Sequence, residues 1–342
     1  QAAGQARDRD LAAACRLAAR EVRDALRLIE SDPAWLAGLP QAAGARQAYY
    51  RGLAALAGGE PGRAVADLSL AVADTRAGVR VRLALATALR QAGDLQQARE
   101  QFQQVLAQPE SLSVGERLRA EAEAALAAQR PGDAVQALAA LQRLLPDDRE
   151  VAFALADAQL QARRPEAAAG SLATLDTLAS GEGEDPRWHL LRARLHLLEH
   201  RRAEAIASAQ RALALAQALG LSSQATQASI DLAQMARADG DLAGARGRLQ
   251  AVLEHGAASP DLIDEARLQL GGVLRDLGDF EASASLLAQA REGFAGRGDR
   301  AGDLRAAIEL HIIESERSRS DGAMAALRAL EPEIAALGDA RL

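Results

Sequence analysis

Several residue types are scarce or missing in this chain of 342 residues. A single cysteine, Cys15, excludes an internal disulfide and any zinc site built from cysteines. Lysine and asparagine are absent, so arginine supplies every basic side chain apart from histidine. Aromatic residues make up only 2% of the chain, which disfavours a β-sheet core because strands are enriched in aromatic side chains.

Long apolar runs and a basic charge balance are missing as well. No stretch approaches the ~20 apolar residues that span a bilayer, and no signal peptide is recognisable, so we expect no membrane insertion. The net charge is −7, which disfavours non-specific binding to a nucleic-acid backbone. The chain begins with Gln1 and not with methionine, which favours a mature segment or a piece of a longer protein.

Alanine and leucine are abundant. They carry most of the 49% apolar residues and favour closely packed helices. A length of 342 residues exceeds one ordinary globular core, so we expect several domains or an open-ended array. The abundance of Ala, Arg and Gly is typical of GC-rich genomes and indicates a bacterial source.

One motif recurs along the chain: Gly-Asp followed by an apolar residue. It lies in QAGDLQQAREQF (91–102), ADGDLAGARGRL (238–249) and DLGDFEASASLL (276–287). Glycine accepts the left-handed conformation that ends a helix, and aspartate caps the start of the next helix. The motif therefore predicts a helix, a tight turn and a second helix.

Small residues follow one register through the chain. Five residues after the motif glycine, or at the equivalent place, stand Ala64, Ala98, Ala134, Ala168, Ala205, Ala245 and Ser283. Twelve residues before each of them stand Gly52, Ala86, Ala122, Ala156, Ala193, Ala233 and Gly271. Intervals of 34 to 40 residues between successive positions are typical of a solenoid of helical hairpins. Facing small residues let the two helices of a hairpin approach closely, and each hairpin is expected to contact only its sequence neighbours.

This pattern resembles the tetratricopeptide repeat family over about residues 41–300. The first two repeats match the family pattern at Gly52, Gly59, Ala64, Leu68, Ala86, Gly93, Ala98 and Phe102. The family's tryptophan and one packing tyrosine are mostly replaced here by Ala, Leu and Arg. The resemblance implies an all-α fold, a right-handed superhelical solenoid of antiparallel helix hairpins. The longer late repeats resemble those of bacterial transcriptional regulators and sensor kinases.

We expect three parts in the chain. Residues 1–40 are predicted as an N-terminal helical cap or a connector, 41–299 as seven repeats, and 300–342 as an irregular eighth repeat with the start of a further one. The predicted N-terminal helix carries one apolar stripe, formed by Leu11, Cys15, Ala18, Val22, Leu26 and Ile29. Because the last residues resemble the opening of a ninth hairpin, we expect the natural protein to continue or a partner to cover this end.

No catalytic arrangement is recognisable. His196 and His200 are four residues apart on one predicted helix, a spacing that can bind a metal, but no third ligand accompanies them and packing is the favoured interpretation. The acidic loop GEGED (181–185) is interpreted as a solvated turn. Neither a nucleophile elbow nor a phosphate-binding loop occurs. We therefore expect no enzyme activity, no cofactor and no bound metal.

The family resemblance also implies where a partner binds, since the first helix of each hairpin lines the concave groove. The candidate partner-binding residues are Arg80, Arg90, Arg119, Phe153, Asp157, Arg187, Arg194, Gln227, Gln234, Arg237 and Arg275. The last four arginines cluster in the fifth to seventh repeats, where guanidinium groups can hold a carboxylate or a phosphate through paired hydrogen bonds. The alternative interpretation is an arginine-rich solvated face.

We favour a non-catalytic protein–protein interaction scaffold, the partner- or signal-sensing module of a larger bacterial regulatory protein. Its expected partner is another protein or an extended peptide in the groove, or else a small anionic ligand. The alternatives are a small-molecule sensor domain whose ligand changes the curvature of the array, and an adaptor for envelope assembly or secretion. We expect a soluble segment without direct nucleic-acid contact, in the cytoplasm or as the extracytoplasmic part of a membrane-anchored sensor.

Overall fold

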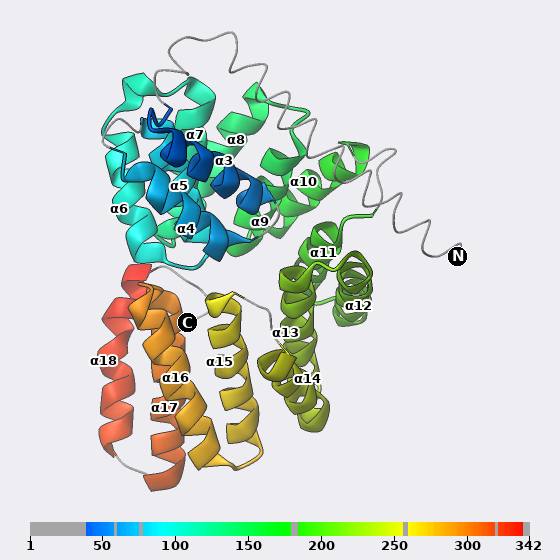
Figure 1. Ribbon diagram of the computed structural model, residues 1–342. Coiled ribbons are helices and arrows are strands. Elements are labelled where there is room, and N and C mark those ends of the chain that lie inside the picture. Colours follow the sequence, from blue (N-terminus) through cyan, green and yellow to red (C-terminus); the bar gives the residue numbers. More distant parts are fainter. Residues whose placement is uncertain are drawn as a thin grey trace, which may run out of the picture. The chain divides into compact units, whose positions relative to one another are not determined.

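The computed structural model describes residues 39–57, 60–74, 78–178, 184–255, 259–318 and 321–337. Within these ranges the regular elements are sixteen α-helices and one short 3-10 helix, and no strand occurs (Figure 1). The predicted all-α fold is thus confirmed. Nearly all of the predicted N-terminal cap, and the predicted start of a ninth hairpin beyond residue 337, lie outside the described residues, so the three-part division stays a prediction.

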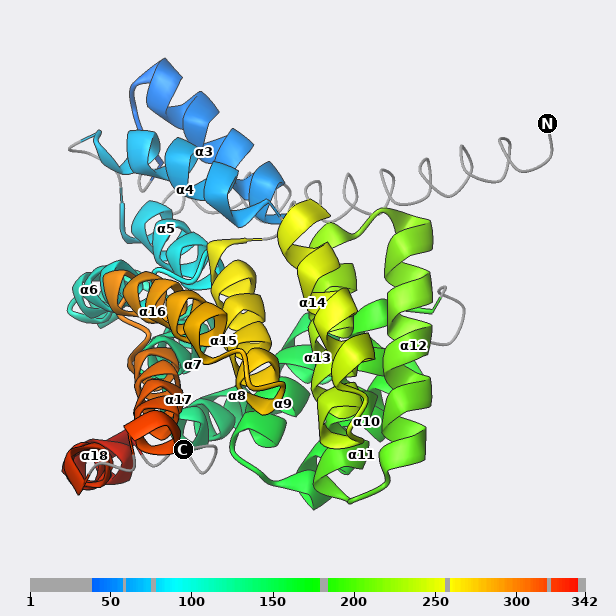
Figure 2. The same cartoon turned by 90° about the horizontal axis from the view of Figure 1, so that it is seen from below.

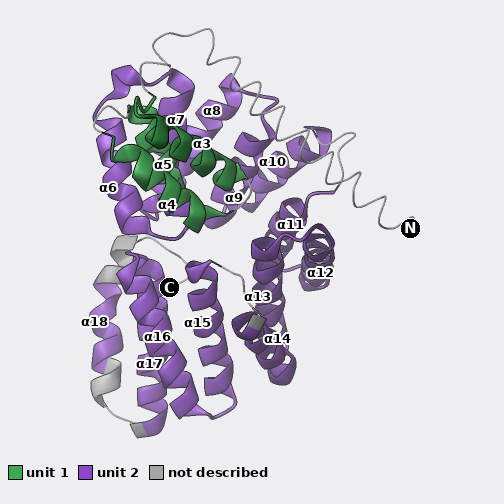
Figure 3. Cartoon of the chain, viewed as in Figure 1, with its two compact units in different colours: residues 1–88 green, residues 89–342 purple. Residues whose placement is uncertain are grey.

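The chain divides into two compact units, residues 1–88 and 89–342 (Figure 3). Unit 1 contains α3 (Ala43–Ala57), α4 (Pro61–Val72) and most of α5 (Val79–Gln91). Its first two helices form a close hairpin, because a Cβ atom on Gly52 would lie only 2.5 Å from Cγ of Leu68. An ion pair of 2.7 Å between Arg51 Nη2 and Asp67 Oδ1 joins the same two helices.

Unit 2 contains a longer run of helix hairpins. Its elements are α6 (Leu95–Leu106), η1 (Pro109–Ser111), α7 (Val114–Ala127), α8 (Pro131–Leu144), α9 (Arg149–Gln161), α10 (Pro165–Leu178), α11 (Pro186–Leu198), α12 (Arg202–Leu219), α13 (Ser222–Ala238), α14 (Leu242–His255), α15 (Pro260–Asp276), α16 (Phe280–Gly296), α17 (Arg300–Ser318) and α18 (Asp321–Leu337). Each helix packs against the next one along the chain. The first helices α9, α11, α13, α15 and α17 also pack on one another in that order.

The predicted register of small residues fits the packing of the hairpins. All fourteen small positions are buried. At the last pair, Ser283 Oγ donates a hydrogen bond of 2.6 Å to the carbonyl oxygen of Gly271, across the two helices of the hairpin. A Cβ atom on Gly271 would lie 2.6 Å from Cγ of Leu287, so a larger residue would push the helices apart. The small residues therefore set how closely α15 and α16 approach.

The turns between helices show the predicted glycine and capping aspartate, and in some turns another residue replaces the glycine. Gly93 has a φ of +80°, and Asp94 then accepts a hydrogen bond of 3.0 Å from the backbone N–H of Gln97, which caps α6. Three other turns place a residue with a side chain in the same left-handed conformation: Gln129, Arg163 and His200 have φ values of 57°, 54° and 59°. The turn geometry is thus kept even where the repeat lacks its glycine.

The expectation that each hairpin contacts only its sequence neighbours is wrong at one place in unit 2. The backbone N–H of Gln96 donates a hydrogen bond of 3.0 Å to the carbonyl oxygen of Arg297. Gln129 Nε2 likewise donates to Asp299 Oδ1 at 2.6 Å. The turn between α16 and α17 therefore lies against the start of α6 and the turn between α7 and α8 (Figure 2). The small rotations between successive hairpins add up until distant turns meet.

Candidate binding face

The surface formed by α9, α11, α13, α15 and α17 is called here the first-helix face of unit 2. Because these helices pack directly on one another, residues one repeat apart come within reach of each other's side chains. Most of the predicted partner-binding residues stand on these helices or on α7. The structure places charged side chains of both signs along them.

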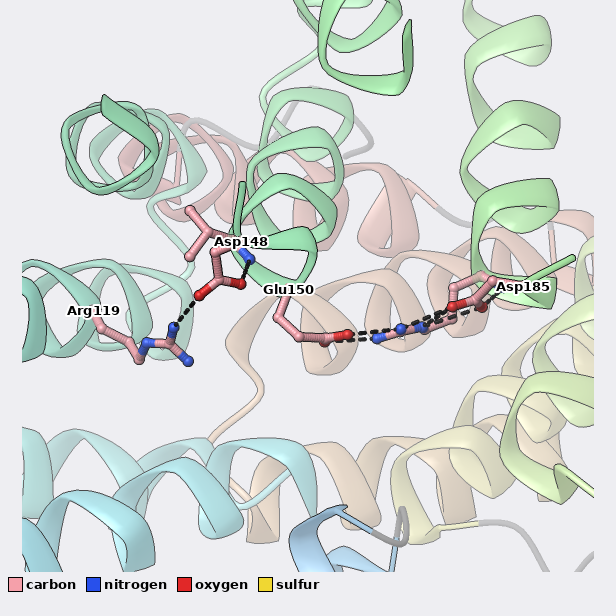
Figure 4. Close-up of polar contacts among 6 residues, drawn as sticks. Arg119, Asp148, Glu150 and Asp185 are labelled. Carbon is pink, nitrogen blue, oxygen red and sulfur yellow. Dashed lines mark hydrogen bonds and ion pairs between the residues drawn. The ribbon is translucent and has the colours of Figure 1, made fainter. Parts of the chain in front are cut away.

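At the start of α9, two carboxylates turn to opposite sides. Figure 4 shows Asp148 facing Arg119 on α7, and Glu150 facing the start of α11. Arg119 Nη2 lies 3.5 Å from Asp148 Oδ2. Glu150 accepts two hydrogen bonds of 2.8 Å from the guanidinium of Arg187. The start of α9 is thus joined by ion pairs to the first helices on both sides.

Arg187 is held from three directions. Besides Glu150, it donates to Asp185 Oδ2 at 2.8 Å, and Asp185 in turn caps α11. The guanidinium carbon lies 4.3 Å from the centre of the Phe153 ring, within cation–π range. Burial alone lowers the pKa of Arg187, but the hydrogen bonds to Glu150 and Asp185 outweigh it and hold the pKa above its usual value. This side chain is therefore a fixed cation in a fixed position.

Arg194, about two turns further along α11, lies between two carboxylates. Its Nη1 donates to Asp157 Oδ1 on α9 at 3.0 Å, and its Nε lies 3.9 Å from Asp231 Oδ2 on α13. Asp231 is only 7% exposed and accepts a hydrogen bond of 2.7 Å from Gln227 at its other oxygen. Burial raises the pKa of Asp231, and the nearby Arg194 and Gln227 offset that rise only in part.

The same arrangement continues over α13, α15 and α17. Arg237 Nε pairs with Asp276 Oδ2 at 2.6 Å. Arg275 pairs with Asp276 at 3.0 Å and with Glu309 on α17 at 2.5 Å. Arg305 on α17 holds both oxygens of Glu265, at 3.0 and 2.8 Å. These pairs link each first helix to the next.

The four arginines predicted to hold an anion are therefore already paired with carboxylates. Each of Arg187, Arg194, Arg237 and Arg275 holds at least one carboxylate. Arg90 pairs in the same way with Glu123 on α7. We call this series of pairs the ion-pair ladder; its members are Arg90–Glu123, Arg119–Asp148, Glu150–Arg187, Asp157–Arg194, Arg194–Asp231, Arg237–Asp276, Arg275–Glu309 and Glu265–Arg305.

Among the acidic members only Asp157 is a predicted partner-binding residue. The pairing of the carboxylates with the arginines was not predicted, and neither was Arg305. The signal was available, since Glu150 and Arg187 are 37 residues apart and Arg275 and Glu309 are 34 apart, which is one repeat in each case. Opposite charges at that spacing predict pairs between neighbouring first helices. Two remaining predicted residues stand apart: Gln234 is half-buried on α13, and Arg80 belongs to unit 1.

The two histidines considered as metal ligands lie in different surroundings. His196 is buried, and its Nδ1 lies 3.5 Å from Glu199 Oε2, whereas His200 forms the left-handed turn after α11. Among the residues that the structure describes, no group of three or more His, Cys, Asp or Glu side chains is arranged to hold a metal ion. None of the described helices combines the length and apolar character that a membrane crossing requires.

Comparison with known proteins supports the repeat fold. A family model described as a tetratricopeptide repeat-like domain matches residues 192–311. No curated protein matches the chain. A solved structure of a Rap protein complexed with competence and sporulation factor is 11% identical, with a TM-score of 0.63, and the match covers 86% of this chain and 87% of that one.

Two further solved structures give the same result. NprR in complex with its cognate peptide NprX is 10% identical, with a TM-score of 0.57, over 83% of this chain and 88% of that one. A tetratricopeptide repeat protein from Parabacteroides merdae is 13% identical, with a TM-score of 0.51, over 78% of this chain and 99% of that one. Likeness at such low identity identifies the fold and leaves the ligand open.

Proposed function

We propose that this chain, which has the fold of tetratricopeptide-repeat proteins, is a non-catalytic protein-interaction module whose first-helix face binds an extended peptide segment of a partner. Two structures of the same fold, the Rap protein with competence and sporulation factor and NprR with its cognate peptide NprX, support a peptide ligand here. The binding residues of this proposal are those of the ion-pair ladder, together with Phe153, Gln227 and Gln234.

The ion-pair ladder is the main support for peptide binding on the first-helix face. Packed helices lie about 8–10 Å apart, and an extended peptide advances about 3.3 Å per residue. About three residues of a bound peptide therefore pass each first helix, and every third side chain meets a new pair of charges. Backbone amides of a peptide carry both donors and acceptors, and they match a face that presents both guanidinium and carboxylate groups.

The charge balance of the ladder disfavours a small anionic ligand. A free phosphate or carboxylate on Arg187 would have to displace Asp185, whose side chain is 20% exposed, or the more exposed Glu150, and it would leave that carboxylate without its partner. Around Arg187 and Arg194 the carboxylates outnumber the guanidinium groups: they are Asp157, Glu150, Asp185 and Asp231. A peptide with basic side chains fits this part of the face better than an anion.

We further propose that the module senses its partner on behalf of a larger bacterial regulatory protein. The support is the resemblance of the long late repeats to regulator arrays and the fold shared with the Rap protein and NprR. No observation favours the small-molecule sensor or the envelope adaptor over this function.

The test is an inversion of one ladder pair. In the double variant Glu265→Arg with Arg305→Glu, the two charges attract each other as before, but a ligand meets them in exchanged positions. Peptides selected from a displayed random library on the wild-type chain are expected to bind this variant at least about tenfold more weakly, because charge pairing fixes register. Binding is measured by calorimetry, and folding by circular dichroism.

The matched control inverts a pair off the first-helix face, Glu184→Arg with Arg211→Glu, whose two side chains are both 53% exposed. This control should keep wild-type affinity. Equal affinity for the wild-type chain and the Glu265/Arg305 variant would contradict the proposal, as would a library that yields no peptide at all.

A further inference from the structure

Two turns far apart in sequence are held together by hydrogen bonds in unit 2. The carbonyl oxygen of Arg297, after α16, accepts from the backbone N–H of Gln96 at 3.0 Å. Arg99 on α6 donates through Nη1 to the carbonyl oxygen of Gly298 at 3.3 Å and to that of Ala127, the last residue of α7, at 3.1 Å. One guanidinium thus joins the C-terminal end of α7, where backbone carbonyls carry partial negative charge, to the turn between α16 and α17.

Gln129 forms the second half of the contact. Its backbone is in the left-handed conformation, with a φ of 57°, in the turn between α7 and α8. Its side chain donates to Asp299 Oδ1 at 2.6 Å and accepts from the backbone N–H of Ala301 at 3.2 Å. Asp299 itself caps α17 by accepting from the N–H of Gly302 at 2.9 Å. Gln129 therefore completes the cap of a helix that begins 171 residues later in the chain.

Glycines let the two sides approach. A Cβ atom on Gly298 would lie 2.8 Å from Cβ of Gln96, and one on Gly93 would lie 2.8 Å from Cβ of Asp261. Both glycines have positive φ values, which the turns require anyway. The other glycines with positive φ differ in this respect, since a Cβ atom on Gly220, Gly240 or Gly278 would meet nothing within 4 Å. The two glycines at the contact are thus the ones approached from a distant part of the chain.

The contact is polar and lies between turns. In the described part of unit 2, α6 and α7 do not pack side by side with α16 or α17, whereas each consecutive pair of helices does. Water can replace hydrogen bonds of this kind at a small net change in free energy. The stacking of neighbouring hairpins, by contrast, is maintained when the rotation between repeats changes slightly.

From these observations we propose that residues 297–299, with Gln96, Arg99 and Gln129, form a reversible latch. When closed, it fixes the rotation between the hairpins from α6 to α17. When open, the hairpins separate at the latch while each one stays folded, and the first-helix face becomes accessible along its length. The second statement rests on the proposed function, whereas the latch itself does not.

The test measures the distance across the latch with spin labels. Cysteines replace Gln103 on α6 and Glu292 on α16, both exposed, in a chain that also carries Cys15→Ser. Pulsed electron–electron double resonance then gives the distribution of distances between the two spin labels in the absence of any ligand. The latch variant is Gln129→Gly, which removes the side chain but suits the left-handed backbone, so the turn itself is not strained. Adding Arg99→Ala gives a stronger variant.

We expect one dominant short distance in the otherwise wild-type chain, and a longer and broader distribution in Gln129→Gly that grows further with Arg99→Ala. The control His200→Gly makes the same change in a turn with the same backbone conformation, and it should leave the distribution unchanged. Identical distributions in all variants would overturn the latch. So would loss of helix content in Gln129→Gly, since it would make the contact a requirement for folding.

The effect on binding is a separate measurement. A peptide selected on the wild-type chain should associate severalfold faster with Gln129→Gly than with His200→Gly, because the open state is populated more often. An unchanged association rate alongside a changed distance distribution would overturn the link to binding and keep the latch. A chain that binds no peptide would overturn the proposed function, while the spin-label distances would still decide about the latch.

Discussion

At the scale of single residues, the first-helix face contains carboxylates whose proton affinities are shifted in opposite directions. Burial raises the pKa of Asp231, which is 7% exposed and has an ion pair of 3.9 Å with Arg194. Burial acts in the same direction on Asp276, but hydrogen bonds from Arg237 and Arg275 outweigh it and lower the pKa of Asp276. The two groups therefore make opposite contributions to the pH dependence of stability.

Replacing Asp231 by Asn is expected to stabilise the chain, relative to wild type, increasingly as the pH rises. Below its unfolded-state pKa, Asp231 is protonated in both states and has no effect; as the pH rises through its raised folded pKa, ionisation in a buried place lowers the free energy of unfolding. Asn does not titrate, so the stability of Asp231→Asn relative to wild type should increase as the pH rises above about 4. Urea unfolding at several pH values measures this difference.

Asp276→Asn is the control with the opposite sign. Its lowered folded pKa contributes stability that is present above the unfolded pKa and is lost as the pH falls through the folded pKa. This variant should therefore lose stability relative to wild type as the pH rises towards about 4, and its stability relative to wild type should change little above that pH. Parallel trends for the two variants would contradict the assigned environments.

At the scale of the element, the hairpin was the part of the fold that could be predicted best. Gly-Asp fixed the turns, and the facing small residues fixed which sides of the helices meet. The prediction missed that Gln129 and Arg163, residues with a side chain, take the place of the turn glycine in two repeats. Hydrogen bonds within the turn and helix packing on both sides outweigh the intrinsic preference of the backbone at these positions.

Two glycine substitutions separate packing from helix propensity. Gly271→Ala would bring a Cβ atom to 2.6 Å from Leu287, so we expect a loss of stability of about 1–3 kcal/mol from overpacking. Gly170→Ala, inside α10, would meet nothing within 4 Å and should raise stability by roughly 0.5–1 kcal/mol. Urea unfolding followed by circular dichroism measures both. A stabilising Gly271→Ala would contradict the close approach of α15 and α16.

At the scale of the whole molecule, the sequence predicted a series of repeats but not the contact between repeats that are far apart in the chain. The predicted arginines pair with carboxylates one repeat away. This pairing can be read from the sequence when residues of opposite charge are compared between equivalent positions of neighbouring repeats. The contact between Gln129 and Asp299 has no such signal, because it depends on the sum of many small rotations between hairpins. Within unit 2, the ion-pair ladder and the latch belong to one run of hairpins.

The measurement that tests the account most directly is photo-crosslinking of a selected peptide that carries a photoreactive residue at every third position. Mass spectrometry then maps the attached residues. If the peptide lies along the first-helix face, crosslinks are expected on the first helices α9, α11, α13 and α15, with successive peptide positions on successive helices. Crosslinks confined to the second helices α10, α12, α14 and α16 would contradict this placement.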